Sequence, residues 1–93
     1  MLNTRTIPSR PLNITQLNRQ SRELLENHFG QIWVEGEISN FLRAASGHCY
    51  FSLKDSKAQI RCALFKGRNR SLSCTPKNGL QVLARGKISL YEP

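Results

Sequence analysis

Hydrophobic residues recur along this chain with two different spacings, one typical of a helix and the other typical of strands. Over residues 15–28, small and apolar residues are three or four positions apart, which places them on one face of a helix. Thr15 is the expected N-cap, and Gly30 favours the left-handed backbone that often ends a helix. Residues 1–10 have no such periodicity and are predicted to form a flexible tail.

From Gln31 onward, apolar and polar residues alternate, which predicts half-buried strands. Gly36 and Gly86 interrupt two of these patterns and suggest bends, such as a strand needs when a sheet curls into a small barrel. Residues 40–46 are expected to form a loop. The four predicted strands cover residues 31–39, 48–54, 58–65 and 80–91.

One domain over residues 11–93 follows from this order of a helix and four strands. The class is mainly β with an N-terminal helix, and the best match is the OB-fold, a small Greek-key β-barrel. That fold has five strands, so the domain is expected to be truncated before its fifth. An open barrel edge would permit self-association.

The second and third predicted strands form a hairpin with two different faces. Its inward-facing residues are apolar: Cys49, Phe51, Leu53, Ile60, Cys62 and Leu64. A turn at residues 55–57 would pair Lys54 with Gln59. The remaining pairs on the outward face then follow in steps of two residues: Ser52 with Arg61, Tyr50 with Ala63, and His48 with Phe65.

Charge is distributed unevenly around a net value of +8. Residues 11–40 carry two basic and four acidic residues, whereas residues 41–91 carry ten basic residues and one acid, a net of +9. Charge of one sign attracts polyanions, and nucleic acid is the commonest such partner. A merely solubilising surface is the alternative, and an anionic membrane is disfavoured because the basic part is predicted to be strands rather than an amphipathic helix.

Several other classes of protein are not indicated. The three cysteines are odd in number and lack a C-x-x-C spacing, which predicts a reducing, cytoplasmic location and small buried hydrophobes at Cys49 and Cys62. The chain has neither a long apolar run nor a secretory signal. Glu35 and Glu37 are interpreted as exposed strand positions, so we expect no catalytic residue, metal site or cofactor in this chain.

The outward face of the hairpin is the candidate nucleic-acid-binding site. Aromatic rings can stack on the bases of a single strand, and nearby cations can contact its phosphates. Tyr50 and Phe65 are the expected platforms. Trp33 is expected to pack against the helix or, less favoured, to be exposed for stacking. The complete candidate set is Arg43, His48, Tyr50, Lys54, Arg61, Phe65, Lys66, Arg68 and Arg70.

Several segments in this order resemble one family: VEGEISNF (34–41), SGHCYFSLKD (46–55), QIRCALFKGRNR (59–70) and GLQVLARGKISLYEP (79–93). Together with the helix, they resemble the N-terminal domain of the exodeoxyribonuclease VII large subunit. The resemblance implies an OB-fold at the front of a longer protein that degrades single-stranded DNA together with a small subunit. It places the nuclease domain downstream, so no catalytic residue carries over. The alternatives are a stand-alone RNA-binding OB domain and a subunit-docking module in which a partner buries Tyr50 and Phe65.

Overall fold

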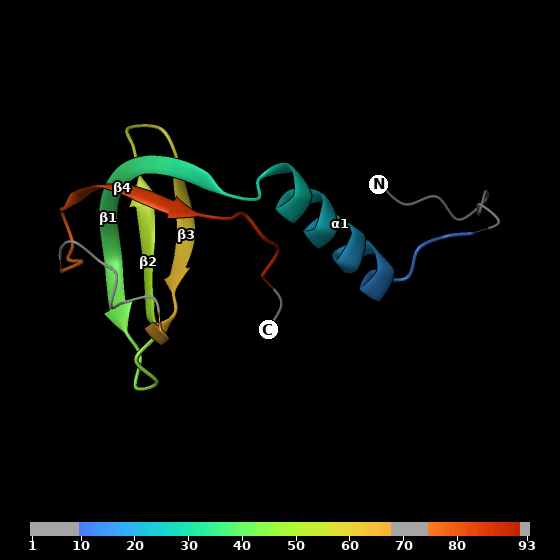
Figure 1. Ribbon diagram of the computed structural model, residues 1–93, viewed down its shortest axis with the longest axis horizontal. Coiled ribbons are helices and arrows are strands. Elements are labelled where there is room, and N and C mark those ends of the chain that lie inside the picture. Colours follow the sequence, from blue (N-terminus) through green and yellow to red (C-terminus); the bar gives the residue numbers. More distant parts are fainter. Residues whose placement is uncertain (1–9, 68–74, 92–93) are drawn as a thin grey trace. The chain divides into compact units, whose positions relative to one another are not determined.

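One helix and four strands make up the computed structural model, which describes residues 10–67 and 75–91 (Figure 1). The elements are α1 (Ile14–His28), β1 (Ile32–Arg43), β2 (Cys49–Lys54), β3 (Gln59–Leu64) and β4 (Gln81–Gly86). This order confirms a mainly β fold with an N-terminal helix. The chain divides into two compact units, of which one holds the sheet (Trp33–Arg85) and the other holds α1 (Met1–Ile32 with Gly86–Pro93). Except for Arg10, the predicted tail lies outside the described residues.

Helix α1 starts one residue earlier than predicted, because its N-cap is Asn13 and not Thr15. The Asn13 side chain accepts a hydrogen bond from the Gln16 backbone at 2.8 Å, and the Gln16 side chain accepts one from the Asn13 backbone at 2.9 Å. This capping box satisfies two backbone donors that a helix otherwise leaves open. The helix ends at His28, and the backbone N–H of its C-cap residue, Phe29, donates to the Leu25 carbonyl. The predicted left-handed glycine at position 30 is wrong, since Gly30 has no positive φ.

The sheet has the strand order β3-β2-β1-β4, with β3 and β4 at the edges of the described sheet. Strands β2 and β3 are antiparallel and pair Lys54 with Gln59, as predicted. Strand β4 joins β1 where the Ile38 N–H donates to the Leu80 carbonyl at 2.9 Å. Its end at Gly86 corrects the predicted strand over 80–91. In the helical unit, the backbone N–H of Ile88 instead donates to Phe29, and the Ser89 hydroxyl bonds Glu26.

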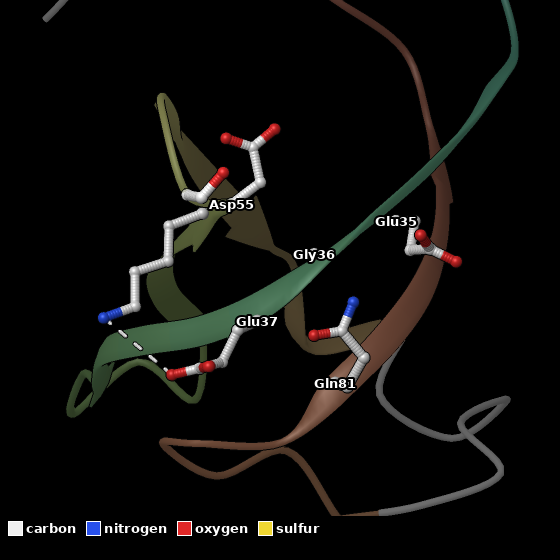
Figure 2. Close-up of a pocket in the computed structure, with 7 residues that line it drawn as sticks. Glu35, Gly36, Glu37, Asp55 and Gln81 are labelled. Carbon is white, nitrogen blue, oxygen red and sulfur yellow. Dashed lines mark ion pairs between the residues drawn. The ribbon is translucent and has the colours of Figure 1, made fainter.

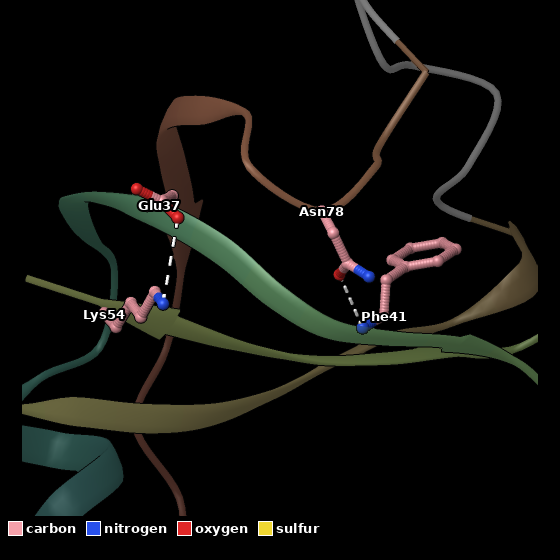
Figure 3. A network of polar contacts seen from close by, with 4 residues as sticks. All are labelled: Glu37, Phe41, Lys54 and Asn78. Carbon is pink, nitrogen blue, oxygen red and sulfur yellow. Dashed lines mark hydrogen bonds and ion pairs between the residues drawn. The ribbon is translucent and has the colours of Figure 1, made fainter.

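Strand β1 is longer than predicted because a bulge carries it through the first half of the expected loop. The register with β2 shifts between Ser39 and Leu42, and Asn40 takes a left-handed φ of 52°. Figure 3 shows the backbone N–H of Phe41 donating to the side chain of Asn78, at 2.9 Å. An extra residue in one strand reverses which side chains face inward. The bulge therefore turns Phe41 toward the core and Leu42 toward the opposite face.

The core of the sheet unit is small. Cys49 is fully buried, and Ile38, Phe51 and Leu53 are at most 9% exposed. The Phe41 ring stacks on Phe51 with centroids 6.2 Å apart, and further side chains packed on this cluster are Val34, Cys62, Leu64, Leu80, Val82 and Ala84. Cys49 thus fulfils its predicted role as a small buried hydrophobe, and Cys62 packs against the core as a half-buried one.

Ile60 departs from the predicted inward-facing set, because its side chain is 45% exposed. It lies on β3, an edge strand of the described sheet. Gly36 in β1, by contrast, has the end of β2 close against it. A Cβ at this position would lie 3.2 Å from the Lys54 carbonyl oxygen, so only glycine allows β1 to pass this close to the end of β2.

Candidate nucleic-acid interface

Four rows of outward-facing side chains cross the sheet from β1 to β3, and we call them together the outer face. From one end to the other the rows are His48–Phe65, Leu42–Tyr50–Ala63, Ser39–Ser52–Arg61 and Glu37–Lys54–Gln59. Neighbouring rows are two residues apart along a strand, which corresponds to about 7 Å. The outer face is therefore about 20 Å long and changes in chemistry from an aromatic and basic end to an acidic end.

The basic end of the outer face holds His48 and Phe65, and Lys66 follows Phe65 along the chain. The rings of His48 and Phe65 meet edge to face, with centroids 5.4 Å apart and planes at 88°. The backbone N–H of Lys66 donates to Nδ1 of His48 at 2.9 Å. Phe65 itself remains 58% exposed. Arg43 ends β1 at the same end of the sheet and is also exposed, but it pairs with the buried Cys49 and therefore lies on the opposite side of the sheet from the outer face, so the structure does not group it with His48 and Phe65.

Ser52 and Arg61 occupy the third row. Although Ser52 faces outward, it is only 2% exposed. Arg61 lies across from it on β3 and donates from Nη1 to the Ser52 hydroxyl at 2.9 Å. The hydroxyl thus has a partner in its buried position, and the guanidinium, an ion suited to phosphate, is held over the sheet.

Leu42 is a member of the outer face that the sequence pattern did not identify. It pairs with Tyr50 in the register of β1 and β2, and its side chain is 60% exposed. On the other side of Tyr50 lies Ala63, which adds only a methyl group. Tyr50 therefore lies in a row of apolar side chains. The signal for Leu42 was present in Asn40, a residue type that tolerates the left-handed conformation of a bulge.

Lys54 lies at the other end of the outer face, among carboxylates. Its ammonium pairs with Glu37 at 3.8 Å, and both side chains remain nearly half exposed. The pair lines an open hollow of about 390 Å³. Figure 2 shows Glu35, Glu37 and Asp55 among the residues that line it. The residues that line the hollow carry three carboxylates and one ammonium, a net negative charge that repels phosphates, and Lys57 adjoins the hollow on the turn.

Asp55 belongs to the turn between β2 and β3. Its carboxylate accepts hydrogen bonds from the backbone N–H groups of Lys57 at 2.8 Å and Ala58 at 2.9 Å. These two bonds stabilise the charged form and lower the pKa of Asp55 from its usual value. Asp55 thus acts as a turn residue, and this role alone accounts for an acid at this position.

Trp33 lies at the start of β1 and is 63% exposed. Its predicted packing against the helix stays a prediction. The guanidinium carbon of Arg85 is 5.9 Å from the centre of its ring. Glu35 and Glu37 separate Trp33 from the hairpin along the outward side of β1. Two further candidates, Arg68 and Arg70, lie outside the described residues.

Two further structural results concern the described residues 10–67 and 75–91. They contain no group of three or more His, Cys, Asp or Glu residues that could hold a metal ion. None of their helices is long and apolar enough to cross a membrane.

The fold and the outer face define a class of protein: the chain belongs to the family of OB-fold nucleic acid binding domains, whose model matches residues 12–93. Individual relatives of the chain carry a more specific name. A protein named exodeoxyribonuclease 7 large subunit from Alcanivorax borkumensis is 59% identical over 90 residues, which is 95% of this chain and 20% of the relative. Proteins of the same name from Sodalis glossinidius (80 residues, 86% of this chain, 18% of the relative) and Hahella chejuensis (85 residues, 91% and 19%) are each 56% identical.

These matches confirm the resemblance found in the sequence. The chain spans about a fifth of the length of the curated relatives that it matches. It is a nucleic-acid-binding OB-fold domain.

Proposed function

We propose that the outer face binds single-stranded DNA and holds it for phosphodiester hydrolysis carried out elsewhere in a longer parent protein. The observation that carries this proposal is the placement of Tyr50, Arg61 and Phe65 on adjacent rows of one sheet face, with Lys66 directly after Phe65. Stacking contributes about 1 to 3 kcal/mol per base, and it requires bases that are free of a duplex. The name of the relatives supports DNA as the substrate.

The charge gradient along the outer face supports a particular path for the strand. Lys66 follows Phe65 at the basic end and Arg61 supplies a cation in the third row, whereas the hollow around Lys54 is acidic. Arg43 is exposed at the basic end of the sheet but on its other side, and it stays a proposed contact only for a strand that wraps around this end. The phosphates are therefore expected to follow the basic end and the two middle rows. Because Lys54 is already paired with Glu37, we assign it a smaller share of the binding energy than Lys66. Arg68 and Arg70 continue the same chain segment and are proposed as further phosphate contacts.

Partners and location follow from the same proposal. In the parent complex, we expect the domain to act beside a small subunit of the exodeoxyribonuclease VII type, in the cytoplasm. The edges of β3 and β4 present backbone groups that a further strand can pair with, and this offers a route to self-association. The domain itself is proposed to need no cofactor.

A binding titration tests the proposal. The chain is titrated with a labelled oligonucleotide of about 16 nucleotides, the upper end of the OB-fold site size, as single strand and as duplex, at several salt concentrations. We expect tighter binding of the single strand and a log–log salt slope of about −0.7 per phosphate contact. Equal affinity for the duplex or a flat salt dependence would overturn the proposal. Stronger binding of the matching RNA would support the RNA-binding alternative, and no binding of either nucleic acid would support a docking module.

A further inference from the structure

We infer that His48, together with Gly47, is a positioning residue that fixes the ring of Phe65 and the backbone of Lys66 for nucleic-acid binding. This inference rests on the proposed function, and it changes the expected role of His48 from a direct contact to an indirect one. One ring nitrogen of His48 accepts a hydrogen bond from the backbone of Lys66, and the ring makes an edge-to-face contact with Phe65.

The backbone of His48 is anchored in the loop between β1 and β2. Its carbonyl accepts from the Ala44 N–H at 2.8 Å, and its N–H donates to the Ser46 hydroxyl at 3.3 Å. The Gly47 N–H donates to the Ala44 carbonyl at 2.9 Å, which closes the loop. A side chain that projects from a loop fixed in this way is a firm support for a neighbouring strand end.

The His48 side chain transfers this support to the end of β3. Phe65 and Lys66 directly follow Leu64, the last residue of β3 that is paired with β2, so they lie beyond the end of the strand. The bond from the Lys66 N–H to His48 Nδ1, at 2.9 Å, holds the backbone there. The edge-to-face contact with the His48 ring, at 5.4 Å, limits the rotation of the Phe65 ring.

Gly47 contributes by leaving room. It has a φ of 92°, and a Cβ at this position would lie 3.0 Å from Cδ and 3.2 Å from Cγ of Lys66. The hydrocarbon stem of Lys66 therefore runs directly over the glycine. Its ammonium is carried at the end of a stem that packs on the protein and is less free than an ordinary surface lysine.

The hydrogen bond from the Lys66 N–H also determines the tautomer of the neutral His48 ring. A backbone N–H donates to Nδ1, so that nitrogen carries no proton and the proton of the neutral ring is on Nε2. A side chain with an acceptor in the position of Nδ1 can replace this bond, whereas an acceptor one atom further out cannot. Asn has its side-chain oxygen in the position of Nδ1, whereas the side-chain oxygen of Gln lies one atom further out.

The experiment combines two measurements on the full chain. The first is the affinity for single-stranded oligonucleotide in two backgrounds, the wild type and a Phe65→Ala, Lys66→Ala variant, each with and without His48→Ala. If His48 acts through Phe65 and Lys66, His48→Ala weakens binding about fivefold in the wild type but has almost no effect once Phe65 and Lys66 are both alanine. Equal losses in both backgrounds would show that His48 contacts the DNA itself and would overturn the inference, as would no loss in the wild type.

The second measurement does not depend on DNA. The amide resonance of Lys66 is followed by NMR in His48→Ala, His48→Asn and His48→Gln, with circular dichroism as the check on folding. We expect His48→Asn to retain the wild-type amide shift and hydrogen-exchange protection, and His48→Gln to lose them as alanine does. Equal loss in all three variants would contradict the positioning role. Since this readout needs no ligand, the proposed function can fail while the positioning of Lys66 by His48 is still confirmed or overturned.

Discussion

Arg61 donates a hydrogen bond from Nη1 to the hydroxyl of Ser52 at 2.9 Å, and this contact joins the two strands of the hairpin on their outer face. Ser52 is 2% exposed, so the contact is also the reason why a polar side chain can be buried there. A guanidinium without such a partner would sample many rotamers. The same contact therefore contributes to stability and orders a cation for binding.

Replacing Ser52 with alanine is expected to weaken single-strand binding about twofold to fivefold, because Arg61 must then be ordered when the DNA binds. The fold should remain, with a loss of about 1 kcal/mol in the free energy of unfolding for one hydrogen bond. Fluorescence anisotropy and urea denaturation measure the two effects. Ser56→Ala, on the exposed turn of the hairpin, is the matched control and should change neither. Unchanged affinity in Ser52→Ala would show that Arg61 needs no support from Ser52.

Lys66 and Lys57 test the charge gradient, since they lie at opposite ends of the hairpin and each carries one positive charge. Lys66→Ala should reduce the log–log salt slope by about 0.7, the amount for one lost phosphate contact on a single strand. Lys57→Ala should leave the slope nearly unchanged, because it adjoins the acidic hollow. Equal reductions in both variants would mean that binding depends on net charge alone.

Asn78 is expected to hold the bulge of β1. In Asn78→Ala the Phe41 N–H loses the side-chain acceptor at 2.9 Å, which should lower the free energy of unfolding by about 1 kcal/mol. Urea denaturation measures the change, and Lys77→Ala is the neighbouring control. An unchanged midpoint in Asn78→Ala would mean that the bulge is fixed by the packing of Phe41 on Phe51 rather than by this bond.

Asp55 should make the stability of the chain depend on pH in acid. Its pKa is lowered in the folded state by the backbone N–H groups of Lys57 and Ala58, so the ionised carboxylate favours folding. This contribution is fully present above the ordinary pKa of 3.8 and is lost as the pH falls through the lower folded-state pKa. Thermal melts at pH 6 and pH 3 should show a smaller acid destabilisation in Asp55→Asn than in the wild type. An identical difference in both proteins would contradict this role.

The hairpin was predictable from the sequence because its two strands alternate regularly and its turn contains Asp55, whose side chain bonds the backbone two and three residues later. Those features determine the register, and with it the meeting of His48 and Phe65. The family could be identified for a similar reason, since its motifs cover most of the sheet and the helix.

Other features depend on contacts between distant parts of the chain. The bulge at Asn40 is held by Asn78, which is 37 positions away, and a period-two pattern has no way to include an extra residue. Leu42 was therefore missed, and the strand that contains it was predicted to end too early. The exposure of Ile60 follows from the position of β3 at the sheet edge, a property of the topology rather than of local periodicity.

The start of α1 shows another limit of prediction from the sequence. Both Asn13 and Thr15 are residue types that cap helices, and the choice between them was settled by Gln16, which completes a reciprocal pair with Asn13 alone.

The role of Lys54 at the site was also not predictable from residue type alone. Its charge suggested a phosphate contact, but its pairing with Glu37 requires two strands to be placed side by side.

If the outer face binds the bases of a single strand, the double variant Tyr50→Ala with Phe65→Ala removes both of its stacking platforms. Its matched control is Trp33→Ala with Tyr91→Ala, which removes two exposed aromatic rings elsewhere. With folding checked by circular dichroism, affinity for a single-stranded oligonucleotide should fall at least tenfold in the first variant, since each stacked base is worth about 1 kcal/mol or more, and should change little in the control. Wild-type affinity in the Tyr50 and Phe65 variant, or an equal loss in the control, would contradict the account.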